Sequence, residues 1–221
     1  SGNEKEKKVM PVVLGYGSLL NAESLQRTLP RKIREELQPV LVPGFRRLFN
    51  LIMLSQVDRK AAIGGQAIGA LNAVADPTEE LGPVAFSLTE EEFEPLDRRE
   101  YCYFKIEDIP ISDFYTGESL DAGMLYSVYP AAELEERFPE RYRREIGPLG
   151  EDGITSSEIL PGDAYLTLCL QGAYSWGEDF GNHFLDHSFL ADGWTSLREY
   201  LDGVEIRDRL GLDIGEYLRN R

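Results

Sequence analysis

Val12-Val13-Leu14-Gly15-Tyr16-Gly17-Ser18-Leu19-Leu20 is the stretch that decides how this chain begins to fold. Its three leading apolar residues predict a short buried strand, and Gly15 and Gly17 predict a tight turn in which positive φ angles are allowed. Asn21 can then cap a helix that continues to about Leu29. A strand that enters a helix through Gly-x-Gly brings backbone N–H groups together, which favours a bound anion or carbonyl oxygen. The same residues also fit an ordinary tight turn.

Two phosphate-binding patterns are absent around this turn. The dinucleotide fingerprint needs a third glycine where the chain has Leu20, and no Gly-Lys-Ser or Gly-Lys-Thr of a P-loop occurs anywhere in the sequence. The backbone donors from Tyr16 to Leu19, together with the hydroxyl of Ser18, therefore suit a small carboxylate or carbonyl better than a pyrophosphate.

The rest of the chain predicts an α+β fold. Thr89 followed by Glu90-Glu91-Glu92 is a typical helix start, and from Pro130 onward helical spacing dominates. Pro43-Gly44 and Asp76-Pro77 are expected to separate strands. We expect a mixed, mostly antiparallel, barrel-like sheet over residues 11–128, flanked by helices, with strands near 12–14, 37–42, 45–53, 68–74, 83–88, 101–106 and 122–128 and further helices near 90–99, 131–146, 162–173, 179–190 and 195–201.

Composition and charge limit the partners. The 221 residues carry a formal net charge of −16, which disfavours nucleic acid and anionic membrane surfaces. No run approaches the ~20 apolar residues that span a bilayer. Cys102 and Cys169 each lie in an apolar run and are expected to be core residues rather than a disulfide or metal pair, which suits the cytoplasm. Residues 1–10 are expected to be a disordered or tag-derived lead-in.

Among 39 acidic residues, Glu100 has the best physical reason to be functional. The acids over 90–94 lie in the first half of a predicted helix, where the helix dipole favours a solvated negative charge. Glu100 lies at the opposite end, where the dipole opposes negative charge and the aromatic residues over 101–104 reduce solvation. Both effects favour a proton on a carboxyl group, as a general acid/base requires, whereas Arg98 and Arg99 oppose them if they face it.

Four segments, in order, resemble the γ-glutamyl cyclotransferase superfamily, which includes the ChaC-like and AIG2-like proteins. Its signature loop is similar to residues 15–20. The family's strand motif G-[FWY]-R-x-x-F is similar to Gly44-Phe45-Arg46-Arg47-Leu48-Phe49, and its L-D-x-x-E segment, which carries the catalytic glutamate, to Leu96-Asp97-Arg98-Arg99-Glu100. Pro161 to Tyr165 and Gly172-Ala173 resemble its closing helix. The resemblance thus covers roughly residues 12–173.

This resemblance implies a γ-glutamyl cyclotransferase-like domain over residues 11–173 that releases 5-oxoproline from a γ-glutamyl amide without a metal or other cofactor. Glu100 would be the general acid/base, with Tyr16, Gly17, Ser18 and Leu19 binding the substrate. Tyr126 either lines the pocket, as an aromatic on this strand often does in the family, or is an ordinary strand aromatic. Tyr101-Cys102-Tyr103 differs from the glycine-containing sequence of glutathione-specific members, which argues against specificity for glutathione and favours γ-glutamyl amino acids or γ-glutamyl amines as substrates.

Residues 174–221 lie beyond the resemblance and are expected to form a helical extension packed on the same domain. This extension either covers the pocket and selects the leaving amine or mediates homodimer formation. Within it, His183 and His187 have the i, i+4 spacing of zinc ligands, for which Asp192 or Glu178 would have to supply a third ligand. Ordinary surface or hydrogen-bonded histidines explain the pair more simply, so the sequence predicts no metal site.

Two rival functions stay open at this point. One is a small-molecule-binding protein on the same scaffold, in which Glu100 has a structural role. The other is a metal hydrolase that uses His183 and His187. A further expectation concerns Arg46 and Arg47: because neighbouring strand residues point to opposite faces, one of them is expected to point inward and pair with a carboxylate.

Overall fold

The first strand and its turn form as the sequence predicts. The computed structural model describes residues 11–30, 34–52, 68–100, 103–146 and 154–202, and in it β1 (Val12–Gly15) leads through the short helix η1 (Ser18–Leu20) into α1 (Ala22–Thr28). The side chain of Asn21 caps α1 by accepting hydrogen bonds from the backbone N–H groups of Glu23 at 3.1 Å and Ser24 at 3.2 Å. The cap sets where the turn ends and the helix begins.

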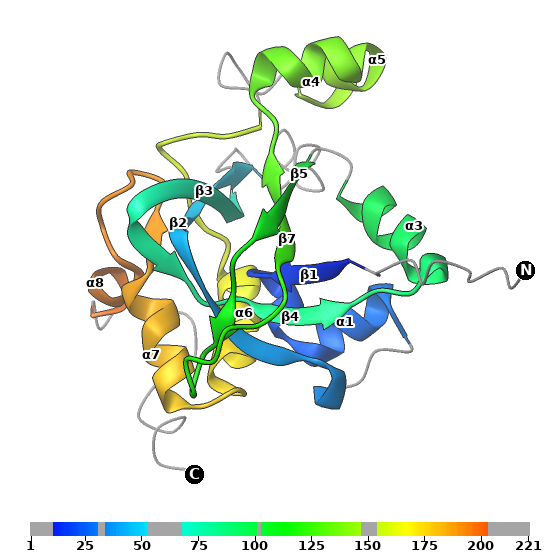
Figure 1. The fold of residues 1–221 in the computed structure, drawn as a ribbon. Helices are drawn as coiled ribbons and strands as arrows, with labels where there is room; N and C mark the ends of the chain where they lie inside the picture. Colours follow the sequence, from blue (N-terminus) through cyan, green and yellow to red (C-terminus); the bar gives the residue numbers. More distant parts are fainter. Residues whose placement is uncertain (1–10, 31–33, 53–67, 101–102, 147–153, 203–221) are drawn as a thin grey trace, which may run out of the picture.

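A curved, mixed sheet surrounds this strand (Figure 1). Its strands follow the order β5-β7-β1-β4-β2-β3-β8, with β6 and β9 paired to β2. Most pairings are antiparallel, and β1 with β7, β2 with β9 and β3 with β8 are parallel. The remaining strands are β2 (Gln38–Ile52), β3 (Ile68–Leu81), β4 (Val84–Ser87), β5 (Tyr103–Ile109), β6 (Ser112–Asp113), β7 (Gly123–Val128), β8 (Leu160–Pro161) and β9 (Ser188–Leu190). The predicted α+β class is confirmed, but the sheet is open rather than a closed barrel, with β5 and β8 at its two ends.

Helices flank the sheet at different places along it. Figure 1 shows α4 and α5 beyond the end of β7, whereas α6 packs against η1 and α7 packs beside α6. Phe180 and Phe184 of α7 are fully buried in the main core. The other helices are η2 (Arg34–Glu36), α3 (Glu90–Arg99), α4 (Ala131–Arg137), α5 (Pro139–Arg141), the π-helix η4 (Tyr142–Ile146), α6 (Asp163–Tyr174), α7 (Glu178–Asp186) and α8 (Leu197–Leu201). In the described part of the chain, no helix is long and apolar enough to cross a bilayer.

Two of the predicted breaks lie inside continuous strands. Pro43-Gly44 was expected to divide two segments, yet β2 runs through it with a bulge at which Gly44 takes a φ of +84°. Asp76-Pro77 likewise lies within β3, where the pairing with β2 jumps from Ala75 to Glu80. The side chain of Asp76 forms a local turn there by accepting hydrogen bonds from Thr78. Turn residues can therefore bend a strand without ending it, because the bulge absorbs the extra residues.

The C-terminal region also differs from the prediction. The helix expected over 179–190 ends at Asp186, and β9 then pairs in parallel with β2. Residues 174–202 thus contribute a strand to the sheet as well as the helices α7 and α8, and their apolar side chains join the main core. The predicted lead-in, Cys102 and residues 203–221 lie outside the described residues. Cys169 is a fully buried core thiol, as predicted.

Candidate active site

The glycines of the first turn are needed for close packing. A Cβ added at Gly15 would lie 2.7 Å from the Cβ of Leu19, and one added at Gly17 would lie 2.6 Å from the hydroxyl oxygen of Tyr165. Neither glycine has a positive φ, which corrects the expectation from the sequence. The turn is glycine-rich because η1 and α6 approach its backbone closely, not because the backbone is left-handed.

Tyr16 is fixed in the centre of this region through both of its oxygens. Its hydroxyl donates a 2.7 Å hydrogen bond to the backbone carbonyl of Tyr126 on β7, and its own carbonyl accepts a 2.8 Å bond from Nε of Arg47 on β2. The ring is buried. Burial raises the pKa of the Tyr16 hydroxyl well above its usual value, and the negative charge of Glu100 raises it further. At neutral pH this hydroxyl is therefore a proton donor.

Glu100 approaches the same region from the end of α3. It is the C-cap of this helix, where its N–H donates to the carbonyl of Leu96 at 3.0 Å, and its side chain is half-buried. The charge of Glu100 raises the pKa of Tyr16 and also that of Tyr126, after the larger effects of burial and of Asp97 on Tyr126. The structure therefore brings the loop residue Tyr16, Tyr126 and Glu100 within electrostatic reach of one another.

Asp97 connects the helix end to the strand. Its carboxylate accepts a 3.1 Å hydrogen bond from the Tyr126 hydroxyl and lies 2.7 Å from the ammonium of Lys105 on β5. Lys105 also lies over the ring of Phe93, with 4.2 Å between its Nζ and the ring centroid. The sequence placed Asp97 in a motif without giving it a role. Asp97 lies three residues before Glu100, and this spacing, which brings two side chains to the same helix face, could have indicated that Asp97 belongs to the same site.

Tyr165 and Cys169 close the region from α6. The hydroxyl of Tyr165 accepts a 3.3 Å hydrogen bond from the backbone N–H of Leu71, and burial raises the pKa of this hydroxyl well above its usual value. Burial also raises the pKa of the Cys169 thiol to about 12. Because only a thiolate attacks efficiently, Cys169 is not a competent nucleophile at neutral pH.

Arg47 is the inward-pointing arginine, and its partners are not the carboxylate that the sequence suggested. It is fully buried, with its guanidinium 4.7 Å from the ring centroid of Phe184. It donates to the backbone carbonyls of Tyr16 and Gly82, and its Nη1 has no hydrogen-bond partner among the described residues. Loss of hydration lowers the pKa of Arg47 to about 9. Arg46, on the opposite face, binds the carbonyl of Gly193 at 2.6 Å and the carboxylate of Asp76 at 3.3 Å.

The remaining predicted loop residues belong to η1. Leu19 is buried, and Ser18 is half-buried with its carbonyl accepting from the N–H of Asn21 at 3.2 Å. The segment after residue 173 holds η1 in place, since the indole N–H of Trp176 donates a 2.9 Å bond to the carbonyl of Leu20. Elsewhere on the surface, two shallow pockets are lined by other residues, one around Phe86 and Asp121 and one around Thr28 and Glu91.

The chain is similar to known proteins in its structure but not detectably in its sequence. The sequence matches no protein-family model and no curated protein. A structure described as γ-glutamyl cyclotransferase is similar to the chain with a TM-score of 0.53 and 13% identity, covering 92% of this chain and 99% of that one. An uncharacterised human protein is similar with a TM-score of 0.51 and 16% identity over 91% of this chain and 98% of the other. YkqA from Bacillus subtilis gives a TM-score of 0.53 and 13% identity over 80% of this chain and 53% of its own.

These similarities establish the fold. The chain has the γ-glutamyl cyclotransferase fold that the four sequence segments predicted. The similarity also extends past those segments, because residues 1–173 make up less than the 92% of the chain that is covered. At least part of the region after residue 173 is therefore shared with that structure.

Proposed function

We propose that this protein is a cyclotransferase that releases 5-oxoproline from a γ-glutamyl amide, with Glu100 as general acid/base. The observation that carries the proposal is the half-buried position of Glu100 at the end of α3, near enough to Tyr16 and Tyr126 for its charge to raise the pKa of both hydroxyls. The shared fold supports the same reaction class, since one of the similar structures is described as a γ-glutamyl cyclotransferase.

The chemistry needs a single carboxylate. Glu100 takes a proton from the substrate's α-ammonium group, and the free amine attacks the γ-carbonyl carbon to form the new C–N bond of a five-membered lactam. The old C–N bond breaks, and the proton held by Glu100 passes to the departing amine. The regenerated carboxylate then takes the second proton that the attacking nitrogen loses and releases it to solvent. Because the amine and the carbonyl belong to one molecule, proximity supplies much of the rate acceleration.

The surrounding residues suit the supporting roles. Backbone N–H groups from Tyr16 to Leu19 and the hydroxyl of Ser18 would bind the glutamyl head group and the developing oxyanion. Tyr126 would line the pocket, with its hydroxyl held by Asp97. The high thiol pKa of Cys169 favours direct cyclisation over a covalent cysteine intermediate. The C-terminal segment that holds η1 would then shape the space for the leaving amine.

The test is an assay of 5-oxoproline release from γ-glutamyl amino acids, γ-glutamyl amines and glutathione, with Glu100→Gln as the decisive variant. We expect turnover to fall by about 10²- to 10⁴-fold, as is typical when a general acid/base is removed. Glu94→Gln is the matched control, because Glu94 lies on the same helix with its side chain 79% exposed in a pair with Arg98. This control is expected to keep wild-type activity.

Two results would contradict the proposal. Activity that survives in Glu100→Gln would remove Glu100 from the mechanism even if 5-oxoproline is the product. Equal binding of a γ-glutamyl compound by wild type and Glu100→Gln, with no turnover by either, would instead indicate a small-molecule-binding protein on this fold.

A further inference from the structure

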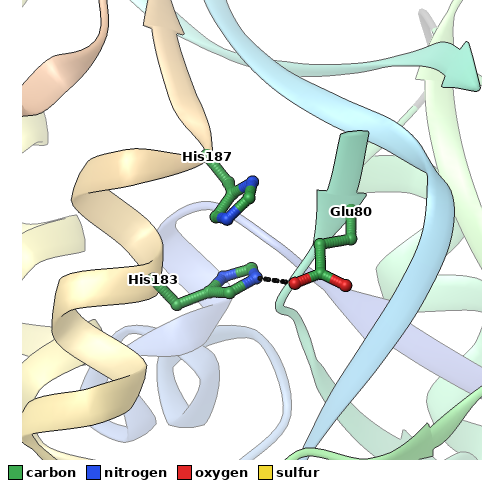
Figure 2. Close-up of side chains that lie close together, drawn as sticks. All are labelled: Glu80, His183 and His187. Carbon is green, nitrogen blue, oxygen red and sulfur yellow. Dashed lines mark hydrogen bonds and ion pairs between the residues drawn. The ribbon is translucent and has the colours of Figure 1, made fainter. Parts of the chain in front are cut away.

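A cluster of metal-ligating side chains lies outside the proposed active site, where α7 meets the end of β3. His183 and His187, one helical turn apart, extend toward Glu80 (Figure 2). One ligand atom from each of the three residues lies within 4.8 Å of the other two. Nε2 of His183 is 3.2 Å from Oε1 of Glu80, and the two imidazole rings stack with their centroids 4.2 Å apart.

We propose that Glu80, His183 and His187 bind one divalent transition-metal ion, with Zn²⁺ as the best match. Two imidazoles and one carboxylate are ligands that Zn²⁺ takes readily, at distances of about 2.0–2.2 Å, and water would complete the coordination. Ligand atoms around a tetrahedral Zn²⁺ lie roughly 3.4 Å apart by these distances. Because the three ligand atoms already lie within 4.8 Å of one another, they need to approach by at most about 1.4 Å.

The residues around the cluster hold the two imidazole rings in orientations that suit metal binding. A Cβ added at Gly82 would lie 2.9 Å from Nδ1 of His183, so the backbone closes that side of the ring and Nε2 faces Glu80. Glu79 lies 2.8 Å from Nδ1 of His187. A carboxylate that holds the second ring nitrogen of a ligating histidine orients the imidazole and strengthens its binding. Glu79 is therefore expected to orient His187.

The charges around the cluster leave it receptive to a cation. The buried guanidinium of Arg47, bound to the carbonyl of Gly82 beside His183, opposes a cation from the core side. Glu79 and Glu80 together outweigh this single positive charge. Asp186, on the same helix, is engaged by Arg198 and would not compete as a ligand. The side chain of Glu80 is 45% exposed, which gives an ion access from solvent.

A bound ion would link two distant parts of the chain. Glu80 and His183 are 103 residues apart, and the ion would fasten α7 to the end of β3. Beside it, the carbonyl of Gly82 accepts a hydrogen bond from Arg47, whose Nε holds the carbonyl of Tyr16. We therefore assign the ion a structural role that steadies the segment after residue 173. The proposed cyclisation needs no metal, so this inference stands or falls independently of that reaction.

The experiment uses the full chain without an affinity tag, stripped with EDTA and titrated with Zn²⁺ by calorimetry and thermal unfolding. We expect saturable binding of one ion per chain and a rise in Tm of about 5–10 °C at a hundredfold excess over Kd. Glu80→Gln should weaken binding by at least about 100-fold, more than the ~10- to 100-fold typical of groups outside the coordination sphere. Glu79→Gln should fall within that smaller range.

Glu178→Gln is the matched control, because it removes the same charge from the exposed start of α7. It should bind Zn²⁺ like wild type, and His183→Asn should lose binding like Glu80→Gln. Because Glu80 is only partly buried, its variant tests the site even if His183→Asn does not fold. Binding without saturation, or binding weakened equally by Glu178→Gln and Glu80→Gln, would show only attraction to an acidic surface and would overturn the proposal.

Discussion

Two groups of polar side chains lie on either side of Gly82, and they are held in opposite ways. Around the first turn, Tyr16, Arg47 and Tyr165 are bound to backbone groups of that turn, of β3 and β7, and of the segment between β3 and β4. At the end of α7, His183 and His187 are bound to the carboxylate side chains of Glu80 and Glu79. In the first group Tyr16 and Arg47 are buried and Tyr165 is partly buried, whereas the second group is partly exposed.

The difference indicates what each group can do. Backbone partners cannot rotate away, so the first group keeps its geometry. If a donor such as Arg47 is lost, the buried carbonyls that it binds are left without a hydrogen bond. Carboxylate partners can turn toward water or toward a cation, so the second group can exchange partners at little cost. We call the first group, Tyr16, Arg47 and Tyr165, the rigid group, and such a group suits the positioning of a reacting substrate. We call the second, His183 and His187 with Glu79 and Glu80, the adaptable group, and such a group suits the capture of an ion.

The largest expected effect comes from removing the buried donor of the rigid group. Arg47→Met should lower the free energy of unfolding by about 3 kcal/mol, because the carbonyls of Tyr16 and Gly82 lose their donors in the interior. Glu79→Gln, which changes one partner in the adaptable group, should cost less than about 1 kcal/mol in metal-free protein. Urea unfolding of both variants measures the contrast.

Arg46→Met is the control for the same change of side chain on the opposite face of β2. Its partners, Gly193 and Asp76, lie near the surface, so we expect a loss of about 1 kcal/mol or less. Equal losses of unfolding free energy for Arg47→Met and Arg46→Met would show that the backbone contacts of Arg47 stabilise the fold no more than the contacts of Arg46. The contrast between the rigid and the adaptable group would then fail.

A second prediction concerns the close approach of α6 to the turn. Gly17→Ala places a Cβ 2.6 Å from the Tyr165 hydroxyl oxygen, and relieving this contact should cost about 1–3 kcal/mol. Tyr165→Phe removes the oxygen, so the double variant should recover part of that loss in a double-mutant cycle. Additive losses would show that the hydroxyl does not limit the space at Gly17.

The sequence predicted the fold better than it predicted these contacts. Local patterns located the first strand, the Asn21 cap and the helix over 90–99, because caps and periodicity depend on neighbouring residues. They failed at Pro43-Gly44 and Asp76-Pro77, where pairing between β2 and β3 carries the chain through a bulge. They also missed β9, a three-residue strand that forms only because β2 offers it an edge.

The same limit applies to the candidate sites. Gly15 to Leu19 and Glu100 were identified from motifs, whereas Tyr165 and the role of Asp97 depend on packing between elements that no local pattern encodes. For the histidine pair, the sequence offered Asp192 and Glu178 as a third ligand. Asp192 instead accepts hydrogen bonds from Thr195 within its own turn, and the carboxylate beside His183 is Glu80, which lies 103 residues away.

The smallest expected effect is a dependence of stability on alkaline pH that comes from the thiol of Cys169, beside Tyr165 of the rigid group. Burial raises the pKa of Cys169 from 9.0 in the unfolded chain to about 12 in the folded protein, so the folded state holds this proton more tightly. The stabilisation is complete below pH 9 and declines as the pH rises toward 12. By pH 10 the free energy of unfolding should have fallen by about 1 kcal/mol through this thiol, a decline that Cys169→Ala should lack.

Both proteins are best compared in a Cys102→Ala background, where alkylation with iodoacetamide reports on Cys169 only. Slow alkylation of the folded protein at pH 8 is expected, and a rate near that of the unfolded chain would mean that the thiol is not held in its neutral form.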